Sequence, residues 1–248
     1  MDTLTNGLSV EVISNGKKYH TLDDWGLAIG NNNYIGEPEQ ETNYVDIPGT
    51  NIFLDLSESL TGAPVYKSRS MNITLGGIRE RMAWDGIISD LRNKIHGREC
   101  KVIFDNDISH YWKGRVYIEG FDRVRELGTL QMNMPKTEAY KYDVQSSAED
   151  WLWDTFDFEY GVIRTIETQY VNGETKIEIP EGTMLTVPVF MVEGIASSEF
   201  TVSDGLNTFN LINGKNRFPR LKVCGENPVT LVFKGRGQVQ IDYRGGSL

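Results

Sequence analysis

The sequence predicts a mainly β protein made of an N-terminal β-sheet or sandwich domain with one α-helix and a C-terminal β-sandwich of the jelly-roll kind. Short segments in which apolar and polar residues alternate recur along the chain, and such alternation is typical of half-buried strands. Only one segment places its apolar residues at helical spacing. The length of 248 residues fits two domains of ordinary size, each with its own core.

The first strands are expected near the N-terminus and in the seventies. Leu8, Val10 and Val12 alternate with polar residues, and Asn15-Gly16 then supplies a hairpin turn. Residues 71–75 alternate in the same way, and Gly76-Gly77 is expected to end that strand.

A second hairpin is expected around the turn at residues 105–107. The strand before it ends at Phe104, and the strand after it places Trp112, Val116 and Ile118 on one face. Gly114 interrupts this strand, where a bulge or a close backbone contact is expected.

The single predicted helix covers residues 81–96. Gly97 stands where a left-handed C-cap is favoured, and the last turn is rich in cations, which complement the helix dipole. The apolar residues of this segment recur at helical spacing and form one stripe, whose members are Trp84, Ile87, Ile88, Leu91 and Ile95. This stripe should pack on the N-terminal sheet and close its open face.

The domain division is expected between residues 136 and 150. The strand 130–134 should end at Pro135, because proline cannot donate to a ladder. We therefore assign residues 1–142 to the N-terminal domain and 143–248 to the C-terminal domain.

The second half contains alternating segments alone, spaced about a dozen residues apart, which is typical of a sandwich or jelly roll. Turns are expected at Asn172-Gly173, Asp204-Gly205 and Asn213-Gly214. The glycine-rich stretches at Gly76-Gly77 and 235–237 are interpreted as strand turns rather than phosphate loops.

Charge and composition exclude several functions. Thirty-five acidic and twenty-five basic residues give a net charge of −10, which makes sequence-independent binding to a phosphate backbone unfavourable. Sequence-specific nucleic-acid binding is not expected either. The arginines near residues 79–98 are interleaved with acids and form a mixed-charge face.

No apolar run reaches the roughly 20 residues of a membrane helix, and the N-terminus lacks the pattern of an export signal. Membrane insertion is therefore not expected. Cys100 and Cys224 are expected to be reduced and buried.

No catalytic, cofactor or metal site is expected. The three histidines lack metal-ligand spacing, and no serine or cysteine stands in a nucleophile context. Residues 105–116 resemble a calcium loop only in part, because His110 replaces the turn glycine and Val116 the bidentate glutamate. We expect an exposed turn there and a protein that is not an enzyme.

The aromatic segment 151–160 is the one candidate ligand platform. Trp151 and Trp153 share a strand face, and aromatic faces with nearby acids can bind sugars. Core packing or subunit contact explains the same pattern and is favoured. Trp151 and Trp153 are therefore candidate ligand or interface residues.

Several short motifs, in order along the chain, resemble one family. They are residues 44–50 (YVDIPGT), 53–56 (FLDL), 95–97 (IHG), 111–116 (YWKGRV), 217–219 (RFP), 225–227 (GEN) and 235–248 (GRGQVQIDYRGGSL). Together they resemble the distal tail proteins (Dit) of long-tailed, siphovirus-type bacteriophages. The resemblance covers nearly the whole length.

This resemblance implies a ring-forming N-terminal domain, a galectin-like C-terminal sandwich and a homo-oligomer, a hexamer. It implies a structural baseplate-hub protein that joins the major tail tube protein to the tail-associated lysin or fibre protein and leaves a channel for the tape-measure protein and DNA. A receptor-binding protein is a further implied partner. The implied location is the virion tail tip, after synthesis in the bacterial cytoplasm.

Two alternatives stay open. The alternative to the tail-protein function is a carbohydrate-binding adhesion module for the bacterial host surface. The acidic stretch at residues 37–41 is either a solvated loop, which we favour, or a partner contact.

Overall fold

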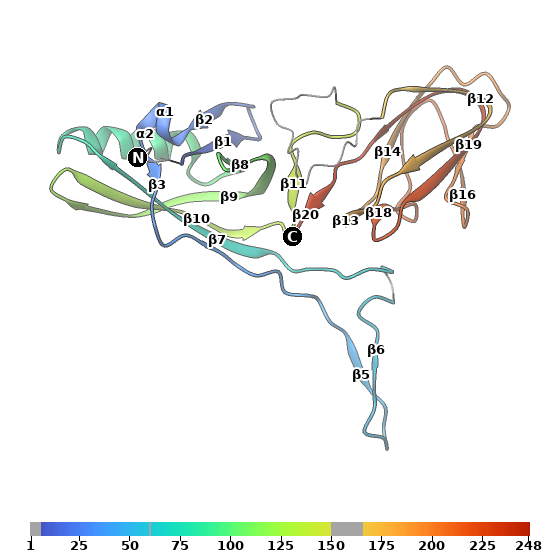
Figure 1. Ribbon diagram of the computed structural model, residues 1–248, viewed down its shortest axis with the longest axis horizontal. Coiled ribbons are helices and arrows are strands. Elements are labelled where there is room, and N and C mark those ends of the chain that lie inside the picture. Colours follow the sequence, from blue (N-terminus) through green and yellow to red (C-terminus); the bar gives the residue numbers. More distant parts are fainter. Residues whose placement is uncertain (1–5, 60, 150–165) are drawn as a thin grey trace. The chain divides into compact units, whose positions relative to one another are not determined.

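The computed structural model describes residues 6–59, 61–149 and 166–248, and it is mainly β, as the sequence predicts (Figure 1). The chain divides into two compact units: unit 1 covers residues 1–141 and unit 2 covers residues 142–248. Each unit has its own cluster of buried apolar side chains.

One antiparallel sheet forms the body of unit 1. Its strands follow the order β2-β1-β8-β9-β10-β7-β3, and β4 also pairs with β7. The elements are β1 Leu8–Val12, β2 Lys18–His20, α1 Thr21–Trp25, β3 Ala28–Ile29, β4 Tyr34–Ile35, β5 Tyr44–Asp46, β6 Phe53–Asp55, β7 Arg69–Ile78, α2 Ala83–Ile95, β8 Arg98–Phe104, β9 Asp107–Val124 and β10 Leu127–Thr137, followed by β11 Lys141–Asp143 at the division.

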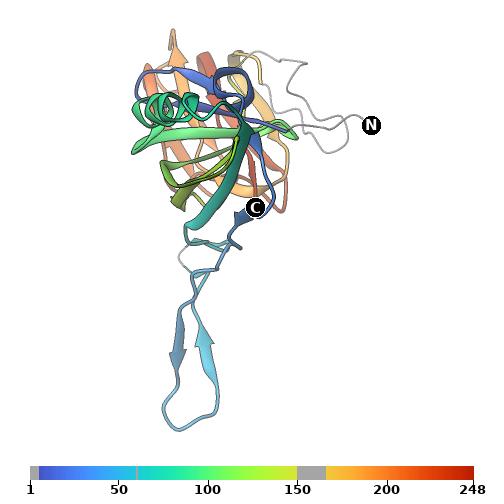
Figure 2. The same ribbon diagram turned by 90° about the vertical axis from the view of Figure 1, so that its left-hand side faces the viewer.

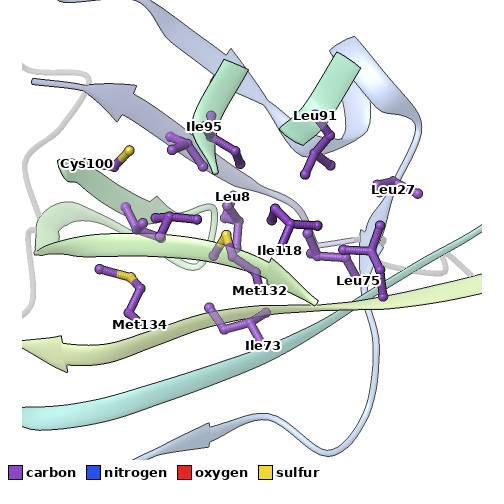
Figure 3. Packing of buried hydrophobic residues seen from close by; sticks show 14 of the residues in the cluster. Leu8, Leu27, Ile73, Leu75, Leu91, Ile95, Cys100, Ile118, Met132 and Met134 are labelled. Carbon is purple, nitrogen blue, oxygen red and sulfur yellow. The ribbon is translucent and has the colours of Figure 1, made fainter. Parts of the chain in front are cut away.

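Helix α2 and the sheet share one core. Leu91 and Ile95 of the helix point toward strand residues such as Leu8, Ile118 and Met132, all of them buried (Figure 3). Trp84, at the start of α2, is fully buried and packs against Phe121, with 5.3 Å between ring centroids. The predicted packing of the helix on the N-terminal sheet is confirmed.

The ends of α2 agree with the predicted 81–96 within two residues, and Gly97 has the expected left-handed φ of 72°. A second helix, α1, was not predicted. It has five residues, so it is too short to show apolar periodicity. His20 accepts a hydrogen bond from the Asp23 amide at its start, and Gly26 ends it with φ 62°.

Two predicted strand ends in unit 1 are wrong. Gly76 and Gly77 lie inside β7, where a Cβ on Gly77 would stand 2.6 Å from the Gly26 carbonyl oxygen. Pro135 lies inside β10, because a bulge between Met134 and Thr137 removes the ladder position that proline cannot fill. The close contact expected at Gly114 is present, since a Cβ there would meet the Lys136 carbonyl oxygen at 2.8 Å.

Unit 2 is built around its longest strand, β19. The larger sheet has the order β16-β15-β19-β14-β17, with β12 also paired to β19, and a small sheet pairs β13 with β18. The elements are β12 Gln169–Ile179, β13 Gly182–Thr186, β14 Val189–Glu193, β15 Thr201–Ser203, β16 Thr208–Asn210, β17 Gly214–Arg217, β18 Val223–Gly225, β19 Val229–Asp242 and β20 Gly246–Ser247.

One of the predicted turns in unit 2 is a strand interior. Asn172 and Gly173 lie within β12, where Gly173 pairs with Gly235 of β19, so the stretch 235–237 is not a turn either. Both paired glycines have positive φ, 94° and 126°, which is the property that mimics a turn signal in the sequence. The turn at Asp204-Gly205 joins β15 to β16 as expected.

Both cysteines are buried, as predicted, and neither forms a disulfide. Burial raises the pKa of the Cys100 thiol to about 11, so this thiol is unreactive near neutral pH. Within the described ranges, neither helix has the length and apolar character needed to cross a bilayer.

Candidate interaction surface

A long hairpin lies between β4 and β7, and none of its described residues belongs to the hydrophobic core of unit 1. We call residues 36–68 the arm. Its strands β5 and β6 pair with each other through Tyr44–Asp55, Val45–Leu54 and Asp46–Phe53. The Ile47 amide donates to the Ile52 carbonyl beyond them. Figure 2 shows this hairpin extending away from the sheet of unit 1.

Strand pairing gives the arm one aliphatic face. Residues directly opposite in an antiparallel pair lie on the same side, and alternate residues of a strand share that side. This face carries Val45, Ile47, Ile52 and Leu54, whose exposed fractions are 45%, 43%, 67% and 50%. We call these four residues the aliphatic face of the arm.

The opposite face of the arm combines aromatic and acidic side chains. Tyr44 and Phe53 meet edge to face with 5.0 Å between ring centroids. Asp46 and Asp55 flank them on the same side. Asp55 also accepts hydrogen bonds from the Ser57 amide and hydroxyl at 2.9 and 2.5 Å, which order the start of the returning chain.

A hairpin that exposes apolar residues on both faces needs a cover. A lone two-stranded hairpin is marginally stable in water, because neither face is buried. Contiguous exposed apolar patches of this kind mark sites of protein interaction. The arm is therefore the candidate interaction surface.

The root of the arm is fixed to the sheet. The Gly36 amide donates to the Ser70 carbonyl, and Arg69 donates to the Gly36 carbonyl at 3.4 Å. The buried guanidinium of Arg69 stacks over Trp112, 4.5 Å from the ring centroid, and burial lowers its pKa. The base of the arm is therefore anchored to the first residues of β7.

The acidic stretch 37–41 lies along the proximal part of the arm. Glu39 pairs with Lys67 at 2.8 Å, and Gln40 forms a β-bridge with Tyr66. Both members of the ion pair are at least half exposed, so the pair contributes little stability. The choice between a solvated loop and a partner contact stays a prediction.

The end of unit 1 is held by Asp107 at the β8–β9 turn. Its carboxylate accepts from Lys141 at 2.6 Å, from Ser109 at 3.2 Å and pairs with His110 Nδ1 at 2.6 Å. Burial opposes ionisation of Asp107, but the hydrogen bonds from His110 and Lys141 outweigh it and hold the pKa of this carboxyl well below its usual range. Asp107 therefore fixes the point where the chain leaves unit 1.

Asp107→Asn should destabilise the protein at neutral pH by about 1–3 kcal/mol, because Lys141 keeps its charge but loses the carboxylate. The folded pKa of Asp107 lies below the unfolded value of about 3.9, so its contribution is complete above that pH and declines as the pH falls further. Urea unfolding of both proteins at pH 7 and pH 3 checks this. An equal difference at the two pH values would contradict the assignment.

The three histidines form hydrogen bonds within unit 1. His20 pairs with Asp105 at 3.0 Å, and His96 Nδ1 accepts from the Ile118 amide at 2.9 Å. In residues 6–59, 61–149 and 166–248, no three His, Cys, Asp or Glu side chains are grouped as a metal site.

Trp151 and Trp153 lie outside the described residues, so the ligand platform they would form stays a prediction. The arm was not singled out from the sequence as a surface, although residues 44–50 and 53–56 were noted as motifs. The signal was available: apolar residues occupy both parities of these strands, which a half-buried strand does not show.

Among the comparisons with known proteins, the one with solved structures finds a similar fold. No family model matches the sequence, and no curated protein matches it. The structure is similar to the crystal structure of the SPP1 Dit (gp 19.1) protein, described as a paradigm of the hub adsorption apparatus in phages that infect Gram-positive bacteria. The TM-score is 0.59 at 10% identity, over 96% of this chain and 98% of that chain. The resemblance to distal tail proteins is confirmed at the level of the fold.

Proposed function

We propose that this chain is a structural protein of a phage tail tip. Six copies of it assemble into a ring that surrounds a channel. The observation that carries the proposal is the similarity of fold to a Dit hub protein across nearly the full length of both chains. The ring, its channel and its position in the virion come from that analogy and from the sequence motifs.

The arm supports assembly from copies of one chain. An exposed apolar hairpin that projects from a fixed root is suited to reach a neighbouring copy. A head-to-tail contact that repeats under rotation closes into a ring with a central opening. No cofactor or catalytic group is needed for such a role, which consists of geometry.

The charge of the chain suits a conduit. A net charge of −10 disfavours tight contacts with a phosphate backbone, so DNA would pass such walls without strong binding. The partners in this proposal are the tail tube protein on one side, the lysin or fibre protein on the other, the tape-measure protein in the channel and a receptor-binding protein at the periphery.

Light scattering across a concentration series tests the proposal. We expect a species near six times the chain mass of 28.1 kDa. Ile52→Asp should weaken its assembly by about tenfold or more, because a charge replaces an interface side chain. Leu206→Asp, at a residue 92% exposed in the β15–β16 turn, is the matched control and should leave the mass unchanged. A monomer at every concentration, alone and with the tail tube protein, would overturn the ring.

A further inference from the structure

Arg69 is a buried cation without a matching anion. It is the first residue of β7 and is 8% exposed. Its Nη1 atom reaches the Gly36 carbonyl at 3.4 Å, which is long for a hydrogen bond. Its Nε and Nη2 atoms are buried and meet no acceptor among the described residues. Because burying a charged group without partners costs free energy, the two unmatched donors are a feature that folding alone does not explain.

The two unmatched donors form one edge of the guanidinium. The N–H bonds at Nε and Nη2 are parallel, and together they match the two oxygens of a carboxylate. One face of the guanidinium is already covered, because Arg69 stacks over Trp112 at 4.5 Å from the ring centroid. Stacking fixes the plane of the guanidinium, and therefore also the direction from which a carboxylate can bind to this edge.

The chain at the base of the arm runs directly beside Arg69. Strand β4 pairs with β7, and the bridge between Gln40 and Tyr66 continues the same antiparallel register. This register places Glu37 opposite Arg69, and opposite residues share a face. Burial lowers the pKa of Arg69, while the charge of the Glu37 carboxylate raises it. The Glu37 side chain is nevertheless exposed and does not reach the two unmatched donors.

Arg69 also connects the arm to two strands of the sheet. The Gly36 carbonyl accepts from its guanidinium, and the Gly36 amide donates to the neighbouring Ser70 carbonyl. On the other side of β7, the Thr137 hydroxyl donates to the Arg69 carbonyl at 3.2 Å. A ligand that orders the Arg69 side chain would therefore act at the point where the arm leaves the sheet.

We propose that the Nε–Nη2 edge of Arg69 is a binding site for a carboxylate. The site lies within unit 1 and does not depend on the proposed ring. The carboxylate can come from two sources. One is Glu37 of the same chain, after rotation about its side-chain bonds, and the other is an acidic side chain of another protein chain. In both cases two charge-assisted hydrogen bonds satisfy the two unmatched donors.

Thermal unfolding of the full chain in sodium acetate tests the site, with sodium chloride at the same ionic strength as the reference. If the carboxylate comes from another chain, the edge is free in the purified protein. Acetate at tenfold excess over its dissociation constant should then raise the melting temperature by roughly 3–6 °C, and Glu37→Gln should show the same rise. If Glu37 fills the edge, the unsubstituted protein should respond little, whereas Glu37→Gln should melt at a lower temperature and recover in acetate.

Three further variants are the controls. Arg69→Lys keeps the positive charge but removes the two-donor edge, so the protein that responds to acetate should lose its response when this substitution is added. Arg115→Lys removes the same edge from an exposed arginine that also donates to a carbonyl, that of Gly97, and should leave the response intact. Glu39→Gln removes a charge two positions from Glu37 and should behave as the unsubstituted protein.

Two results would overturn the site. An equal rise with and without Arg69→Lys would mean that acetate acts elsewhere on the protein. The absence of any rise over chloride in both the unsubstituted protein and Glu37→Gln would mean that the edge binds no carboxylate, and this comparison does not require the Arg69 variant to fold. Light scattering on the unsubstituted protein measures ring formation separately, so failure of the site leaves the proposed function standing.

Discussion

Trp84→Ala is expected to destabilise unit 1 by about 3–5 kcal/mol, the largest loss from any single side chain of its core. Trp84 is fully buried where α2 meets the sheet, and its indole nitrogen donates to the Glu126 carbonyl at 3.3 Å. Alanine leaves a cavity and removes one of the two hydrogen bonds that the Glu126 carbonyl accepts, the other coming from the Arg79 amide. Urea unfolding followed by far-ultraviolet circular dichroism measures the change.

Gly128 provides the control for this prediction. A Cβ on Gly128 would stand 2.4 Å from the Trp84 ring, and the three atoms nearest to it all belong to that ring. Gly128→Ala should therefore cost about 1–3 kcal/mol in the natural background and much less beside Trp84→Ala. Additive losses in the double variant would contradict the packing of Trp84 on Gly128.

Gly235→Ala should have the corresponding effect in unit 2. Gly235 has φ 126°, where a side chain is strained, and its Cβ would stand 2.4 Å from the Glu199 carbonyl oxygen. Strain and overpacking each cost about 1–3 kcal/mol, so the sum exceeds about 2 kcal/mol. Thermal unfolding of the two proteins measures it.

Gly173 is the matched control because it pairs directly with Gly235 across the β12–β19 ladder. It also has positive φ, 94°, but a Cβ there meets nothing within 4 Å. Gly173→Ala should therefore show the strain alone. A loss as large as that of Gly235→Ala would mean that the contact with Glu199 is not the cause.

The core of the fold was predictable from periodicity. The stripe of Trp84, Leu91 and Ile95 gave the helix, and alternation gave β1, β7 and β9, because burial of one face imposes a pattern on neighbouring residues. Gly77 and Pro135 were misjudged for another reason. Each is accommodated by a contact or bulge whose partner is distant in sequence, Gly26 for the first and β7 for the second.

The Arg69 site was harder to find for the same reason. Strand pairing and packing bring Glu37, Arg69 and Trp112 together, although they are far apart in the sequence. The arm, in contrast, is formed by neighbouring residues. Apolar residues at both odd and even positions of 44–54 indicate a strand pair with apolar side chains on both faces. The sequence does not show that both of these faces are exposed in the folded chain.

Electron microscopy of the purified protein in negative stain shows directly whether copies of this chain close into a ring. We expect ring-shaped particles with a central opening and six-fold symmetry, which the Ile52→Asp variant forms far less readily than Leu206→Asp. Particles without an opening, or separate single chains at concentrations and with partners that should favour assembly, would contradict it.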